Sequence, residues 1–148
     1  MKTLIIGYGS TLRRDDGVGY MLAEGLMETM PEDVVIARQL LTPDLAEPVS
    51  QNEQVIFIDA CAKTPPGEVG VRQITPEGEN WGAFVHEMTP GVLLDCVKDL
   101  YGQLPQAWLI TIGGEDFSIG EGLSAKVASV CPQVLREIDR LYRAGKKF

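Results

Sequence analysis

The chain has 148 residues, of which 45% are hydrophobic and 23% charged, and its formal net charge at pH 7 is -8. This is the size and composition of one globular domain, so we assign residues 1–148 to a single domain and exclude a disordered chain. The acidic balance argues against a nucleic-acid partner, because binding to phosphate backbones depends on clustered Lys and Arg.

The predicted elements alternate between strands and helices. In chain order, apolar runs and helical spacing predict a strand at 3–7, a helix at 18–30, a strand at 34–37, a short helix at 42–50, a strand at 55–58, an edge strand at 69–74, a loop at 75–84, a helix at 89–101, a strand at 108–112 and a helix at 123–144. Pro132 lies inside the last helical pattern and cannot donate an amide hydrogen, so we expect a kink or a break near Cys131.

This alternation predicts the α/β class, as a three-layer α/β/α domain with a mostly parallel sheet. Residues 69–74 alternate between apolar and polar side chains, which indicates an antiparallel edge strand with one solvated face.

The sequence also bears on location and redox state. The start of the chain has one Lys and no small-residue cleavage site, so we expect no signal peptide, and no apolar run approaches the roughly 18 residues of a membrane span. We therefore expect a cytoplasmic protein without a membrane partner. The three cysteines, Cys61, Cys96 and Cys131, form no C-x-x-C pair and are expected to be reduced, mostly buried thiols.

Candidate functional residues follow the predicted strands. In parallel sheets, ligands bind beyond the carboxyl ends of the strands. The sequence there holds Gly7 to Ser10 with Asp15 and Asp16, then Asp59, and later Gly113 to Glu115. His86, the single histidine of the chain, comes from the remaining long loop. We expect Gly9, Gly113 and Gly114 to line the resulting cleft.

Simpler interpretations compete at each position. Gly7-x-Gly9 could begin a dinucleotide-binding loop, but Leu12 replaces the third glycine and two aspartates would repel a phosphate. Asp15 or Asp16 could cap the helix that starts near Val18. A lone histidine is more often a surface residue or a hydrogen-bonded core residue than a metal ligand.

A metal site is the alternative that unites the three positions. Two carboxylates, from Asp16 and Asp59, and the His86 imidazole would form an open site suited to zinc, nickel or iron. The sequence has no H-E-x-x-H motif, which excludes an ordinary zincin. Composition permits a Ser-His-Asp triad, but no G-x-S-x-G elbow supplies its nucleophile.

The same residues resemble a known family. Ile6-Gly-Tyr-Gly-Ser10 followed by Arg14-Asp-Asp-Gly-Val-Gly19 is similar to the N-terminal signature of the nickel-iron hydrogenase maturation endopeptidases. Further landmarks follow in the same order, at Ile58-Asp-Ala60, His86, Ile112-Gly-Gly-Glu115 and Gly122-Leu-Ser124. Ser10 stands where the family usually has Asn, and Ala125 where Pro is common.

The resemblance implies a specific activity. Such hydrolases remove a C-terminal extension from the hydrogenase large-subunit precursor after nickel insertion, and they are often grouped with aspartic-type endopeptidases. By position, Asp16, Asp59 and His86 would contact the nickel and serve as the catalytic residues. The metal would be carried by the protein substrate, with other divalent metals substituting in vitro, and the protease would act as a monomer. Two alternatives stay open at this point, a non-enzymatic nickel-sensing chaperone and a Rossmann-type nucleotide-binding module.

Overall fold

The structure, a computed structural model, describes residues 2–83 and 88–145. The elements in chain order are β1 (Thr3–Tyr8), η1 (Arg14–Gly17), α1 (Val18–Met27), β2 (Val35–Arg38), η2 (Pro43–Leu45), α2 (Ala46–Ser50), β3 (Gln54–Cys61), β4 (Val69–Ile74), η3 (Trp81–Ala83), α3 (Pro90–Tyr101), β5 (Gln106–Gly113) and α4 (Ala125–Gly145).

The five strands form one sheet in the order β2-β1-β3-β5-β4. All neighbouring pairs are parallel except β4 and β5, which are antiparallel. This confirms the predicted mostly parallel sheet, and β4 is the antiparallel edge strand that was expected at 69–74.

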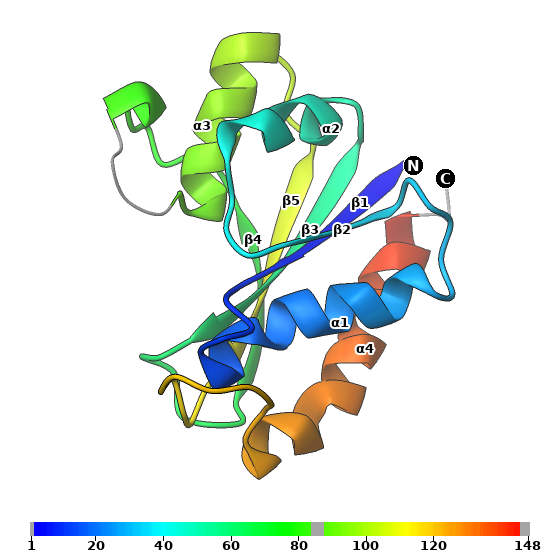
Figure 1. The fold of residues 1–148 in the computed structure, drawn as a ribbon. Helices are drawn as coiled ribbons and strands as arrows, with labels where there is room; N and C mark the ends of the chain where they lie inside the picture. The colour runs from blue at the N-terminus through cyan, green and yellow to red at the C-terminus, as the bar shows by residue number, and fades with distance from the viewer. Residues whose placement is uncertain (1, 84–87, 146–148) are drawn as a thin grey trace.

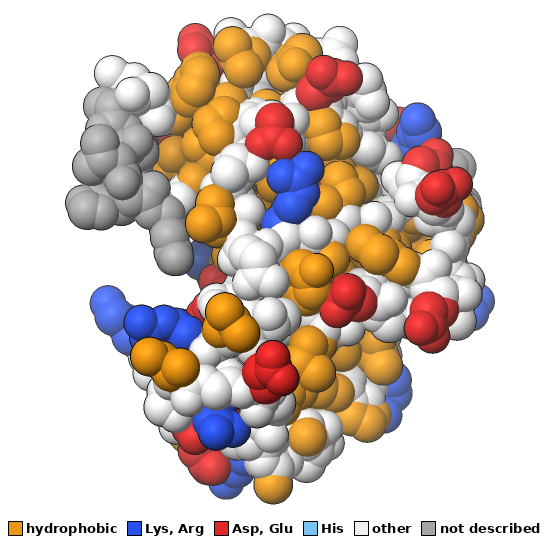
Figure 2. Space-filling view, in the orientation of Figure 1, with side chains coloured by type: hydrophobic (Ala, Val, Ile, Leu, Met, Phe, Trp, Pro, Cys, Tyr) orange, Lys and Arg blue, Asp and Glu red, His pale blue; other side chains and the backbone are white. Residues whose placement is uncertain are grey.

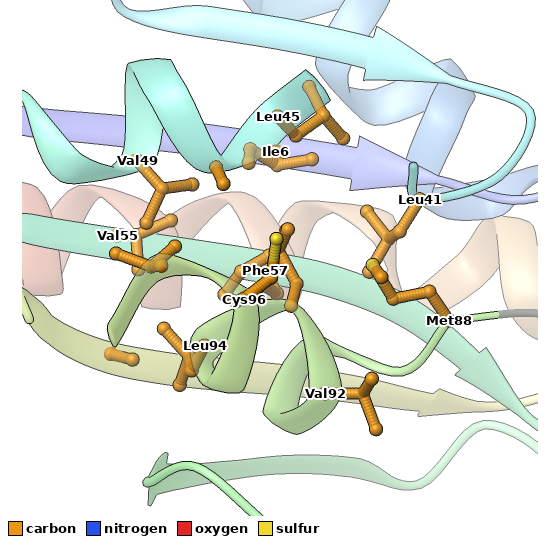
Figure 3. Close-up of a cluster of buried hydrophobic side chains, with 14 of the residues drawn as sticks. Ile6, Leu41, Leu45, Val49, Val55, Phe57, Met88, Val92, Leu94 and Cys96 are labelled. Carbon is orange, nitrogen blue, oxygen red and sulfur yellow. The ribbon is translucent and has the colours of Figure 1, made fainter. Parts of the chain in front are cut away.

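Helices cover both faces of the sheet, with α1 and α4 on one face and α2 and α3 on the other (Figure 1). Successive side chains of β3 pack alternately into the two hydrophobic layers, one on each face of the sheet. Phe57 packs with α2 and α3, whereas Ile56 and Ile58 pack with α1 and α4, and all three are fully buried. Figure 3 shows the α2 and α3 layer, where Leu41 and Met88 lie toward the carboxyl ends of β1 and β3.

We expected a kink or a break near Cys131, and the structure has no break there, because the long C-terminal helix is continuous through Pro132. The reason lies in the position of the proline on the helix. Pro132 is exposed, and so is Ala128, the residue whose carbonyl oxygen the missing N–H would have bonded. The proline therefore lies on the solvent side of the helix, where water can replace that hydrogen bond. The apolar face of the helix, with Val127, Val134 and Ile138 buried, continues on both sides of the proline.

The strand order also locates the functional edge of the sheet. β1 is flanked by β2, which follows it through α1, and by β3, which follows β2 through α2. The chain therefore reverses its direction of winding between β1 and β3. In open α/β sheets, a crevice for ligands forms beyond the carboxyl ends of the two strands at such a reversal. None of the helices in the described part of the chain has the length and hydropathy that crossing a membrane requires.

Candidate active site

A cavity of about 390 Å³ lies beyond the carboxyl ends of β1 and β3. Asp16, from η1 after β1, and Asp59, near the end of β3, both line it. These are two of the three metal-facing residues predicted from sequence, and the fold brings them to one cavity although 43 positions separate them. The other lining residues are Tyr8, Gly9, Gln39, Leu40, Leu41, Ala60, Ala62, Met88, Thr89, Pro90 and Phe117.

Tyr8 fixes the orientation of Asp59. Its hydroxyl donates a hydrogen bond of 2.8 Å to Oδ2 of Asp59, across the β1–β3 pair. The β1–β3 register pairs Gly7 with Ile58, so the next residue of each strand lies at the same level, with both side chains on the α2 and α3 face. Tyr8 is almost fully buried, and sequence reasoning did not assign it a role.

Asp16 is held by the loop that precedes it. Its Oδ2 atom accepts a 2.8 Å hydrogen bond from the backbone N–H of Ser10. Gly9, in the same loop, has a φ of +141°, and a Cβ there would lie 1.8 Å from the carbonyl oxygen of Asp16. A glycine is therefore required at position 9 for the loop to close over η1.

The helix-cap interpretation of Asp15 and Asp16 is wrong. Gly17 is the N-cap of α1, and no side chain caps the helix. Asp15 instead reaches across the molecule to the segment between β5 and α4. Its Oδ2 atom accepts hydrogen bonds from the N–H groups of Glu115 and Asp116, at 2.9 Å each. Both of its oxygens also bond Ser124, through the N–H at 2.7 Å and the hydroxyl at 2.8 Å.

Asp15 is fully buried, and its ionisation follows from these contacts. Burial raises the pKa of the Asp15 carboxyl, but the hydrogen bonds from Ser124, Asp116 and Glu115 together outweigh it and lower the pKa below its ordinary value. The carboxylate is therefore charged at neutral pH and joins η1, which carries Asp16, to the loop that carries Phe117.

A second cavity, of about 550 Å³, adjoins the first. The two share Asp59, Ala60, Thr89 and Pro90, so the start of α3 forms a wall between them. Its other lining residues are Cys61, Arg72, Gln73, Ile74, Thr75, Pro76, Glu77, Gly91, Leu109 and Thr111, which come mainly from β4, β5 and the segment after β4.

The segment after β4 is tied to α3. The nearly buried carboxylate of Asp95 accepts hydrogen bonds from the N–H groups of Glu77, Gly78 and Glu79, at 3.2, 2.9 and 3.2 Å. The hydroxyl of Thr89, the N-cap of α3, bonds the Glu77 carboxylate and accepts from the N–H of Val92. Hydrogen bonds at residues 77–79 therefore hold this wall of the second cavity against α3.

Cys61 lines the second cavity at the end of β3, two residues beyond Asp59. A hydrogen bond from the Thr64 side chain, assisted by the backbone of Lys63 and Thr64, lowers the pKa of the Cys61 thiol against burial and the charge of Asp59. The three cysteines are free, but Cys96 alone is buried, and Cys61 and Cys131 are half-buried. The expectation of mostly buried thiols was therefore wrong for these two.

The remaining sequence predictions have different outcomes. His86 lies outside the described residues, so its place in the site stays a prediction. Gly9 lines the first cavity as expected. Gly113 and Gly114 do not, because they pack against the backbone of Pro65 and the ring of Phe117. Among residues 2–83 and 88–145, no three His, Cys, Asp or Glu side chains cluster as a metal site.

Comparisons with known proteins give a consistent result for the fold. No family model and no curated protein sequence matches the chain. Among solved structures, it is similar to the hydrogenase maturating endopeptidase HybD from Escherichia coli, with a TM-score of 0.74, 20% identity, and 98% of this chain and 94% of that chain covered.

Two archaeal structures are similar over the same length. The nickel-iron hydrogenase maturation protease HycI from Thermococcus kodakarensis gives a TM-score of 0.70 at 18% identity, with 96% of this chain and 92% of that chain covered. The hydrogenase 2 maturation peptidase from a Thaumarchaeota archaeon gives 0.69 at 23% identity, with 96% and 98% covered. The chain therefore has the fold of these hydrogenase maturation proteases over nearly its whole length.

Proposed function

We propose that this chain is an endopeptidase that removes the C-terminal extension of a nickel-iron hydrogenase large-subunit precursor after nickel has been inserted. The observation that carries the proposal is the convergence of Asp16 and Asp59 on one cavity at the winding reversal of the sheet. The shared fold with three proteins named as hydrogenase maturation proteases or peptidases supports it, as does the resemblance of the sequence motifs.

In this proposal the metal arrives with the substrate. Asp16 and Asp59 would face the nickel of the precursor with carboxylate oxygens, and His86 would complete the contact with an imidazole nitrogen. Carboxylate and imidazole ligands suit such a divalent ion, and three protein ligands leave coordination positions for the groups that already hold it. The nickel would supply Lewis acidity near the scissile carbonyl.

The residues of the chain prepare this contact before the substrate arrives. The N–H of Ser10 bonds one oxygen of Asp16, and the hydroxyl of Tyr8 bonds one oxygen of Asp59. Both carboxylates are therefore oriented before the substrate binds. Outer hydrogen bonds of this kind commonly contribute about 10 to 100-fold in metal affinity or activity. The two adjoining cavities, together lined by β4, β5 and the start of α3, offer a path for the extended tail.

The nucleotide-binding alternative is disfavoured by the same geometry. In a dinucleotide site, the N–H groups of the glycine loop face the pyrophosphate. Here the N–H of Ser10 is occupied by the Asp16 carboxylate, and the cavity holds a second carboxylate at Asp59. Two negative side chains in that place oppose a phosphate ligand.

The test compares nickel-loaded and nickel-free precursors of the large subunit encoded in the same genome. We expect the purified chain to shorten the loaded precursor alone, detected as loss of the tail by mass spectrometry. Asp16→Asn and Asp59→Asn are each expected to lower the rate by at least about 100-fold. Glu32→Gln, an exposed carboxylate in the turn before β2, is the matched control and should leave the rate unchanged.

Three outcomes would contradict the proposal. If both precursor forms were processed at equal rates, nickel would have no role in recognition. If neither form were processed, the chain would not be the protease for this substrate. Stoichiometric nickel binding without cleavage would favour the nickel-sensing chaperone instead.

A further inference from the structure

Three aliphatic side chains stand exposed on loops around the mouth of the first cavity. Leu12, Leu40 and Ile119 are 61%, 45% and 82% exposed. Leu40 itself lines the cavity, as does Phe117, which lies two residues before Ile119. We call Leu12, Leu40 and Ile119 the collar. Figure 2 shows hydrophobic side chains at the lower left of this face, with Lys and Arg side chains beside them.

The collar loops are bonded to one another rather than standing alone. The carbonyl of Leu12 accepts a 2.9 Å hydrogen bond from the N–H of Gly120. Thr11 donates its N–H to Oε1 of Gln39 at 3.2 Å, and Nε2 of Gln39 donates to the Thr11 hydroxyl at 3.3 Å. The collar is therefore pre-organised, and a partner that contacts it loses little affinity to the ordering of loops.

The cavity inside the collar has the opposite character. Its charged side chains are the carboxylates of Asp16 and Asp59. Exposed aliphatic side chains on the loops next to an acidic cavity complement a surface that presents a cation with apolar groups around it. The collar would exclude water from the ionic contact, as the rim does around the strongest contacts of protein interfaces. Single exposed hydrophobic residues are ordinary, but these three lie on hydrogen-bonded loops, two of which also line the acidic cavity through Leu40 and Phe117.

We propose that the collar docks the folded body of the protein substrate, so that a metal ion bound to that body faces Asp16 and Asp59. This inference rests on the proposed function and deepens it, because it assigns recognition to the body of the precursor as well as to its tail. The apolar contact with the collar supplies most of the binding affinity for the substrate. The two carboxylates distinguish a substrate that carries the metal ion from one that lacks it.

The test separates binding from chemistry. Charge is placed on the collar by the variants Leu12→Asp and Ile119→Asp and by the double variant. The control is Leu104→Asp, which places the same charge on an exposed leucine between α3 and β5, at the opposite end of the sheet. With the nickel-loaded precursor, we expect the double variant to raise KM at least about tenfold with kcat changed less than twofold. The control should match the wild type. Ile119→Ser, which adds no charge, should raise KM in the same direction by a smaller factor.

Each outcome decides the inference. Melting temperatures equal to the wild type are expected, because both substituted side chains are exposed. If the wild type cleaves the loaded precursor and the double variant has the same KM, the collar does not dock the substrate. If the wild type does not cleave it, the proposed function itself fails. If light scattering shows that the chain forms dimers which the double variant dissociates, the collar binds a second copy and the inference is overturned.

Discussion

The hydroxyl of Tyr8, the last residue of β1, donates a 2.8 Å hydrogen bond to the carboxylate of Asp59, two residues before the end of β3. One of the two carboxylates in the candidate active site thus depends on a neighbouring strand for its orientation. The bond is a feature of this chain's Gly7-Tyr8-Gly9 sequence, because a phenol in the middle position has the length to reach the adjacent strand.

Replacing Tyr8 with Phe tests this dependence. The ring and its packing stay, so we expect the free energy of unfolding to fall by only about 1 kcal/mol, the usual loss of one hydrogen bond. The rate of precursor cleavage should fall by about 10 to 100-fold, because Asp59 would lose its fixed orientation. Urea unfolding and steady-state kinetics measure the two effects. Tyr101→Phe, at the exposed end of α3, is the control. An unchanged rate in Tyr8→Phe would show that the bond has no role in the reaction.

Asp15→Asn tests the buried carboxylate that joins η1 to the segment before α4. The amide retains the shape of the side chain but presents an NH₂ group to N–H donors, so we expect a loss of about 2 to 4 kcal/mol at pH 7. The native pKa of Asp15 lies below the unfolded value of 3.8, so its stabilisation is fully present above that pH and is lost as pH falls through the native pKa. The stability difference between wild type and variant should therefore shrink below about pH 4.

Urea unfolding at a series of pH values measures this difference. The comparison variant is Asp33→Asn, an exposed aspartate before β2, for which a small difference in the free energy of unfolding is expected. A difference between wild type and Asp15→Asn that grew on acidification would contradict the assigned direction of the pKa shift.

The sequence predicted a mostly parallel sheet with one antiparallel edge strand, because both features follow from local patterns. Residues 69–74 alternate between apolar and polar side chains, and β4 has those same bounds. Asp59 was predicted at the site because an acidic residue directly follows the buried run 55–58, and such a position in a parallel sheet is the carboxyl end of a strand.

The errors concern contacts that depend on distant segments. Asp15 and Asp16 are adjacent and chemically identical, yet Asp15 points to residues 115–124 and Asp16 to Ser10 and the cavity. Tyr8 was missed because its partner is set by the register of β1 against β3, which no local pattern encodes. Pro132 was expected to kink or break a helix, but the helix continues through it, with the proline on its exposed side.

His86→Ala tests the part of the site that rests on sequence alone. We expect cleavage of the nickel-loaded precursor to be lost while the melting temperature stays close to that of the wild type, because a ligand carried by a loop contributes little packing. Differential scanning calorimetry and the cleavage assay check the two halves. A large fall in melting temperature would instead identify His86 as a structural residue.

The three thiols should differ in reactivity. The hydrogen bond from Thr64 lowers the pKa of Cys61, whereas burial raises the pKa of Cys96 and of Cys131. Because the thiolate is the reactive form, iodoacetamide at pH 7.5 in the presence of a chelator should label Cys61 first. Peptide mapping by mass spectrometry measures the order.

A matched pair of variants identifies the cause of this reactivity. Thr64→Val should slow the labelling of Cys61, and Thr29→Val, near the end of α1, should not change it. Faster labelling of Cys131 than of Cys61 would contradict the expected order.

Asp95→Asn tests how the second cavity keeps its shape. The three N–H groups of residues 77–79 converge on this one nearly buried carboxylate, and the amide in its place would accept fewer of them. We expect a loss of about 2 kcal/mol in the free energy of unfolding and faster hydrogen exchange at these three amides. Glu77 also bonds Thr89, the N-cap of α3, and α3 begins between the two cavities, so the KM for the precursor should rise. Exchange rates at residues 77–79 equal to those of the wild type would show that the segment is held by other contacts.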